Sequence, residues 1–121
     1  MSQPTNKHRA DPHRGDVWKV AFPNCPNDPH LPRPAIVISN DKHNQYADSV
    51  LVVPVFNDKE LPRLLPTHVF TSKGTGGLTK DSRAMCEHIA SVDKNKLVEQ
   101  LGVMPSIILT SIVQGIKKAV E

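Results

Sequence analysis

A chain of 121 residues is expected to form one domain around a single hydrophobic core. Its formal net charge of +3 favours polyanionic partners only weakly, and an aromatic content of 4% argues against a surface built from stacking rings. No apolar run approaches the about 18 residues that a transmembrane helix needs. Residues 1–13 also lack the hydrophobic segment of a secretory signal peptide, so we expect a cytoplasmic protein that does not associate with membranes.

The N-terminal third of the chain predicts a tail, a strand and a stiff loop. Residues 1–13 are polar and show no apolar period, which predicts a flexible tail before a single domain over residues 14–121. Alternating polar and apolar residues over Asp16–Phe22 predict a half-buried strand. Four prolines from Pro23 to Pro32 exclude a helix and predict an exposed loop, of a length that often carries function.

The rest of the chain predicts further strands and one helix. Short apolar or β-branched segments predict strands at Pro34–Ser39, Ser49–Val55, Thr67–Thr71 and Ser82–Ala90. Asp93 is expected to cap a short helical turn over Lys94–Leu101, and apolar residues at helical spacing after Pro105 predict a C-terminal amphipathic helix. About five strands and one helix indicate a mainly β (α+β) fold, a small antiparallel barrel-like sheet with the helix packed on it.

Three familiar kinds of site lack their signatures here. The glycines of Gly74–Gly77 predict a turn, because no phosphate-loop pattern or following helix accompanies them. Neither the two cysteines nor the six histidines have metal-ligand spacing, so no metal or other cofactor is expected. Cys86 and His88 would share one face of a strand, with Glu87 facing away, and no serine or cysteine nucleophile motif is present.

Arg33 is the one residue whose position alone indicates chemistry. It ends the proline-rich loop directly before a buried strand, where the five donors of a guanidinium suit a phosphate. The alternative is an ordinary surface salt bridge, with Asp28 or Asp41 as the partner.

Several segments, in this order, carry a resemblance to a known family. They are Arg14–Trp18, Arg33–Asp41, Val52–Val55, Leu65–Val69, Leu78–Ser82 and Glu87–Lys94. Together they resemble the MazF/PemK family of bacterial toxins, and the similarity extends from Arg14 to about Glu121. The pairing of an Arg-Gly-Asp-Val-Trp start with the Arg-Pro strand is the most specific part.

The resemblance implies both a fold and a function. The implied fold is an SH3-like barrel with a C-terminal helix, assembled as a homodimer. The implied function is that of a type II toxin: a metal-independent, sequence-specific endoribonuclease that cuts single-stranded RNA, arrests translation and is neutralised by a cognate antitoxin. Related CcdB-like chains on this fold poison DNA gyrase instead, so the fold alone leaves the target open.

The resemblance also indicates catalytic residues. RNA cleavage needs a base for the 2′-hydroxyl, a cation for the charge at phosphorus and an acid for the leaving oxygen. Arg33 matches the arginine of the Arg-Pro motif, Glu87 replaces a late-strand aspartate as the base, and His30 stands in for a loop histidine as the acid. The chain departs from the family at Phe56, where a threonine is usual, and at Met85, where one branch has an arginine.

A further set of residues is expected to contact RNA. The predicted RNA-binding residues are Ser39, Asn40, Lys42, Phe56, Asn57 and Lys59. Basic residues that would line the groove are Lys42, Lys59, Arg63, Lys73 and Arg83, and the proline-rich loop would cover it. Because of the two departures, three alternatives stay open: a protein that binds RNA but cleaves it weakly, a DNA-binding gyrase poison, and a module that binds only the antitoxin.

Overall fold

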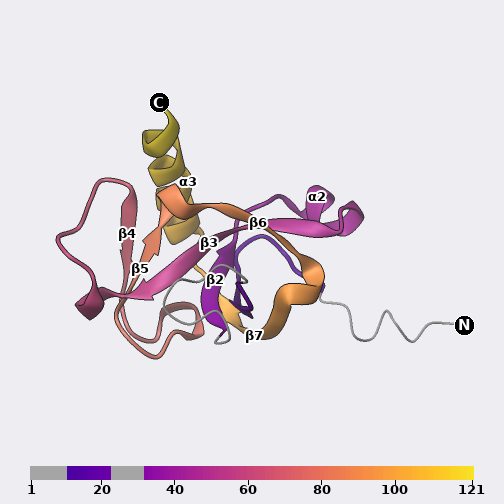
Figure 1. Ribbon diagram of the computed structural model, residues 1–121, viewed down its shortest axis with the longest axis horizontal. Coiled ribbons are helices and arrows are strands. Elements are labelled where there is room, and N and C mark those ends of the chain that lie inside the picture. The colour runs from indigo at the N-terminus through magenta and orange to yellow at the C-terminus, as the bar shows by residue number, and fades with distance from the viewer. Residues whose placement is uncertain (1–10, 23–31) are drawn as a thin grey trace, which may run out of the picture.

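The computed structural model describes residues 11–22 and 32–121 of the chain (Figure 1). The strands in these ranges are β1 (Asp16–Val20), β2 (Arg33–Val37), β3 (Ser49–Asn57), β4 (His68–Thr71), β5 (Ser82–Met85), β6 (Ala90–Asp93) and β7 (Leu97–Val103). The α-helices are α2 (Asp41–Tyr46) and α3 (Ser106–Val120). Short 3₁₀ turns are η1 (Asp58–Glu60), η2 (Thr75–Gly77), η3 (Cys86–His88) and η4 (Lys94–Lys96). No helix in these ranges is both long and apolar enough to span a membrane.

The strands form one antiparallel sheet in the order β4-β5-β3-β2-β1-β7, and β6 pairs with β3 off this path. The predicted small antiparallel sheet with a C-terminal helix is therefore confirmed. The sheet has seven strands in place of about five, and β4 and β7 end the path without pairing to each other. The long strand β3 organises the fold, because it pairs with β2 through Val52–Pro54, with β6 through its start and with β5 through its last residues.

Two predicted elements are wrong, and strand pairing explains both. The segment Ser82–Ala90 is not one strand: β5 ends at Met85, η3 turns the chain, and β6 begins at Ala90 against another part of β3. The segment Lys94–Leu101 is not a helical turn beyond η4, because β7 pairs with β1 from Leu97 onwards. Backbone pairing with β1 thus overrides the local helical preference.

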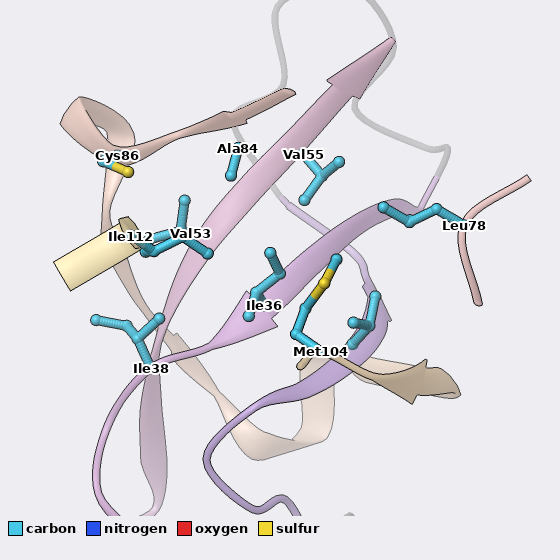
Figure 2. Packing of buried hydrophobic residues seen from close by; sticks show 10 residues of the cluster. Ile36, Ile38, Val53, Val55, Leu78, Ala84, Cys86, Met104 and Ile112 are labelled. Atoms are coloured by element: carbon cyan, nitrogen blue, oxygen red, sulfur yellow. The ribbon is translucent and has the colours of Figure 1, made fainter. Parts of the chain in front are cut away.

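The main hydrophobic core lies between one face of the sheet and α3 (Figure 2). Its members from the sheet include Val17, Ile36 and Val53, which are fully buried. Ile112 of α3 is also fully buried, and the picture shows it beside Val53. Farther along α3, a Cβ on Gly115 would lie 2.7 Å from Sγ of Cys86. Glycine at this position therefore lets the helix approach the turn η3 closely.

A second apolar cluster covers the other face of the sheet. It comprises Val20, Ala35, Val37, Val50, Val52, Val92 and Leu97, with Trp18 and Phe22 packed against it. Side chains alternate between the two faces of a strand, so Arg33 continues the row of Ala35 and Val37 on β2. Phe56 likewise continues the row of Val50 and Val52 on β3. Both residues therefore lie on the face of the sheet that α3 does not cover.

Candidate functional site

Arg33 and Phe56 form the centre of the candidate site. The guanidinium carbon of Arg33 lies 4.2 Å from the centroid of the Phe56 ring. Arg33 begins β2, and Phe56 lies near the end of the antiparallel neighbour β3, so the β2–β3 register brings them together. A cation–π contact of this kind contributes about 0.5–1 kcal/mol at an exposed site and more when it is shielded from water. Phe56 thus supports the Arg33 cation from the position at which a threonine hydroxyl is usual in the family that the sequence resembles.

The carboxylate of Glu87 is fixed by the side chains of Thr67, which directly precedes β4, and of His68, the first residue of β4. Thr67 Oγ1 donates a hydrogen bond of 2.9 Å to Oε1 of Glu87. Nε2 of His68 lies 2.9 Å from Oε2, while the backbone N–H of Leu65 donates to Nδ1 of the same ring at 3.4 Å. Because Nδ1 accepts, Nε2 carries the hydrogen and donates to the carboxylate. The His68 side chain is 2% exposed and that of Glu87 is 28% exposed, so a buried ring orients an accessible carboxylate.

These contacts also set the charge of Glu87. Partial burial by itself would raise the pKa of the carboxyl group, but hydrogen bonds from its own backbone N–H, His68 and Thr67 outweigh burial. The pKa of Glu87 therefore lies below its ordinary value of 4.5. The group is a carboxylate at neutral pH, able to accept a proton or a hydrogen bond.

The turn η3 also brings His88 to Phe56. The two ring centroids are 6.4 Å apart, with the ring planes inclined by 57°. Phe56 therefore lies close both to Arg33 and to the turn that carries Glu87 and His88. From the sequence alone, His88 is a candidate metal ligand or partner of the Cys86 thiol, and no role at an RNA site is predicted for it. Its place next to Glu87, in a segment that resembles the family, was the signal available for a site role.

Cys86 does not share a face with His88, contrary to the expectation from strand geometry. The segment is a 3₁₀ turn, so Cys86 points into the core while Glu87 and His88 are exposed. Burial, followed by the charge of Glu87, raises the pKa of the Cys86 thiol to about 11. The thiol is therefore protonated and unreactive at neutral pH.

The predicted RNA-binding residues fall into two groups at opposite ends of β3 (Figure 1). Phe56 and Asn57 end β3 beside β5 and Lys59 follows in η1, whereas Ser39, Asn40 and Lys42 lie next to the start of β3, around α2. The nine residues of β3 span eight steps along the strand, which corresponds to about 26 Å. The two groups do not form one local surface on a single chain.

Several of these side chains have structural partners. Ser39 is buried, its hydroxyl donates to Oδ1 of Asn44 and it accepts the backbone N–H of Leu51 at 3.1 Å. Asn40 caps α2 by accepting the backbone N–H of His43 at 2.8 Å. Asn57 accepts the backbone N–H of Lys59 at 3.1 Å. Lys42 and Lys59 are exposed.

Arg83, expected to line the groove, is instead 5% exposed. Its Nε and Nη2 donate to Oδ1 of Asp58 at 3.1 and 2.8 Å, and its Nη1 donates to the carbonyl of Pro62 at 2.7 Å. The guanidinium thus anchors the loop that follows η1. Met85, at the position of the family arginine, ends β5 opposite His68 and is half-buried.

Some predicted features lie outside the described residues: His30, Cys25, Asp28 and most of the proline-rich loop. Asp41, the other possible salt-bridge partner of Arg33, accepts the backbone N–H of Arg14 at 2.7 Å. Within the described ranges, no three His, Cys, Asp or Glu side chains gather where they could hold a metal ion.

Solved structures define the class of fold. An endoribonuclease from a mycobacterial species matches with a TM-score of 0.73 at 21% identity, over 92% of each chain. A mycobacterial endoribonuclease in complex with its cognate antitoxin also gives a TM-score of 0.73 at 21% identity, over 89% of this chain and 93% of that chain. At such identities the likeness establishes a shared fold, an antiparallel sheet with a C-terminal helix.

Sequence comparisons identify the family within that class. Endoribonuclease MazF9 of Mycobacterium tuberculosis is 30% identical over 110 residues, which span 86% of this chain and 92% of that protein. The family described as PemK-like, MazF-like toxin of type II toxin-antitoxin system matches residues 13–120. The chain therefore belongs to the PemK/MazF toxin family, which confirms the resemblance found in its motifs.

Proposed function

We propose that this protein is the toxin of a type II toxin-antitoxin system and cuts single-stranded RNA as a metal-independent, sequence-specific endoribonuclease. The observation that carries the proposal is the guanidinium of Arg33 held over the Phe56 ring beside the turn that bears Glu87. Family membership and a relative named as an endoribonuclease support it.

The proposed reaction needs no group from outside the chain. A base removes the proton of a ribose 2′-hydroxyl, and the 2′-oxygen attacks the adjacent phosphorus. The bond from phosphorus to the 5′-oxygen breaks, and an acid gives that oxygen a proton, so the products are a 2′,3′-cyclic phosphate and a 5′-hydroxyl. Arg33 stabilises the negative charge that develops on the phosphoryl oxygens.

Glu87 is the proposed base. It is ionised at neutral pH, and its two oxygens retain acceptor capacity beyond the bonds from Thr67 and His68. The proposed acid is His30. His88 is a second candidate for the acid, because it directly follows Glu87 in the sequence and its ring lies near the ring of Phe56. Phe56 keeps Arg33 in place, which compensates for the missing threonine hydroxyl.

The proposed partners follow from the family and from the surface. A homologous fold has been solved with its cognate antitoxin, and we propose that an antitoxin also neutralises this chain. We further propose a cytoplasmic homodimer. Exposed apolar side chains on the edge strand β7 and the start of α3 support a contact between copies; they are Val98, Val103 and Ile107.

The test is incubation of purified protein with a long single-stranded RNA in the presence of EDTA, followed by mapping of the ends. The wild type is expected to give discrete cuts with cyclic phosphate ends, and Arg33→Ala is expected to lose them while staying folded. Arg33→Lys retains the charge without the planar fork, and Lys117→Ala on the opposite face of the sheet controls for general loss of charge. Absence of cuts by folded wild-type protein would favour a binding-only or gyrase-directed toxin, which a DNA supercoiling assay distinguishes.

A further inference from the structure

A pocket of about 320 Å³ lies at the end of β3, next to the candidate site. Its lining residues are Asn57, Lys59, Lys73, Thr79, Lys80 and Asp81. Asn57 directly follows Phe56, and the Cα atoms of Phe56 and Lys59 cannot be more than about 11 Å apart along the chain. Alternation on β3 directs Asn57 away from the face of Phe56, so a polymer bound at Arg33 and Phe56 would reach the pocket around the end of the strand.

The pocket carries excess positive charge. Three lysines face one aspartate, and Oδ1 of Asp81 already accepts the backbone N–H of Lys73 at 2.8 Å. Within the described part of the chain, none of the three ammonium groups makes a hydrogen bond or ion pair. The nearby carboxylate of Asp58 does not neutralise them, because it pairs with Arg83. The chemistry that complements such a pocket is an anion such as a phosphate.

The backbone around these lysines is fixed by local contacts. Oδ1 of Asn57 accepts a hydrogen bond from the backbone N–H of Lys59. The backbone N–H of Asp58 donates to the carbonyl of Asp81 at 3.1 Å, so η1 is hydrogen-bonded to the opposite wall of the pocket. The N–H of Gly74 donates to the carbonyl of Leu78 at 2.8 Å and closes the turn between Lys73 and Lys80. A Cβ on Gly77 would lie 2.1 Å from the carbonyl oxygen of Leu101, so this turn packs directly on β7. The walls are thus set before a ligand arrives, which lowers the entropic cost of binding.

We propose that this pocket binds a backbone phosphate of the RNA, within one or two nucleotides of the bond that is cut. The inference rests on the proposed ribonuclease function and adds a second phosphate site to it. The volume is at the small end of the range for ligand pockets, which suits a phosphate with its ribose. The pocket lies beyond the reacting atoms, so its lysines contribute to substrate binding and not to the chemical step.

The test compares a triple variant, Lys59→Gln, Lys73→Gln and Lys80→Gln, with the control Lys117→Gln and Lys118→Gln on α3. Each is assayed on an oligonucleotide that spans a mapped cut site and on oligonucleotides shortened from either end. The triple variant is expected to raise KM about tenfold with kcat unchanged, and to lower the salt dependence of log KM by about 0.7 per lost phosphate contact. Shortening the RNA past the bound phosphate should raise KM of the wild type and abolish the difference between wild type and variant.

Two results overturn the proposal while the wild type still cleaves. One is an unchanged KM on the long oligonucleotide, and the other is a loss of antitoxin binding without any change towards RNA, which would assign the pocket to an acidic protein segment. If the wild type does not cleave RNA at all, the proposed ribonuclease function is wrong, and the phosphate site is then tested by binding alone. Single-stranded RNA of mixed sequence, which needs no mapped cut, is then titrated for binding, and equal affinities of the wild type and the triple variant contradict the phosphate site.

Discussion

The guanidinium of Arg33 lies over the ring of Phe56, with 4.2 Å between the guanidinium carbon and the ring centroid. The negatively charged face of the ring attracts the cation and favours this position of the Arg33 side chain. The aromatic residue that departs from the family pattern thereby supports the arginine that matches it. The substitution changes how the cation is positioned and does not remove the cation.

Replacement of Phe56 tests this relationship. Phe56→Leu retains an apolar side chain but loses the ring, and the loss of about 1 kcal/mol of cation–π stabilisation is expected to lower kcat/KM about fivefold. Phe56→Tyr retains the ring and is expected to cleave at close to the wild-type rate. Steady-state cleavage of a mapped oligonucleotide measures both, and a Leu variant as active as the Tyr variant would show that the cation–π contact has no role.

Glu87 should make folding stability depend on pH. Its folded pKa is lowered, so the carboxylate stabilises the fold at pH values above its unfolded pKa, and this contribution is lost as the pH falls through the lowered folded value. Glu87→Gln keeps an acceptor for His68 but carries no charge. Wild type should therefore be more stable than Glu87→Gln at neutral pH, and the difference should shrink below pH 4.5.

Urea unfolding of both proteins across this pH range measures the difference. Glu87→Ala is the sharper disruption, because it leaves the N–H of a His68 ring that is 2% exposed without an acceptor. We expect it to cost about 1–3 kcal/mol at neutral pH, more than Glu87→Gln. A difference between wild type and Glu87→Gln that does not vary with pH would contradict the charged, hydrogen-bonded state of Glu87.

Gly115 should not tolerate alanine, although alanine favours helices by about 1 kcal/mol over glycine. Its Cβ would lie 2.7 Å from Sγ and 3.2 Å from Cβ of Cys86, which is fully buried. Overpacking of this kind costs about 1–3 kcal/mol and is expected to exceed the gain in helix propensity. Thermal unfolding should show Gly115→Ala destabilised, with part of the loss recovered when Cys86→Ala is added. Strict additivity of the two changes would contradict the close contact.

Arg83 is expected to contribute to the stability of the fold and not to RNA binding. Its substitution by Gln removes charged donors from Asp58 and from the carbonyl of Pro62. Because Asp58 is 31% exposed, the expected cost is about 2 kcal/mol, below that of breaking a fully buried pair. Lys19→Gln, which breaks the exposed Lys19–Glu99 pair, is the matched control and should cost less than about 1 kcal/mol. Equal effects of the two variants in chemical denaturation would contradict the anchoring role.

The sequence predicts the elements whose patterns agree with their pairing. The alternation of β1 and the spacing of α3 are strong local signals, and both elements form where expected. β7 has no such signal, because polar Glu99 and Gln100 lie on a strand that, among the described strands, pairs only with β1. The end of β5 at Met85 also depends on residues far away in the sequence, because β5 and β6 pair with different parts of β3.

The same limit applies to the site. Arg33 and Glu87 are recognisable from motifs, but the contacts that orient them come from segments far away in the chain. His68 reaches Glu87 only because β4 pairs with β5, and His88 reaches Phe56 only because the chain turns at η3. The burial of Arg83 depends on Asp58, 25 residues earlier, so composition alone indicates a groove residue where the fold has an anchor.

The most direct test of the account is the single-turnover cleavage rate of Arg33→Ala on an oligonucleotide with a mapped cut, measured beside its affinity for the same oligonucleotide with a 2′-deoxy residue at that position. The cleavage rate of Arg33→Ala is expected to lie about 100-fold or more below that of the wild type, with a much smaller change in affinity and unchanged thermal unfolding. A wild-type rate in Arg33→Ala would contradict the assignment of Arg33 as the group that stabilises the charge at phosphorus.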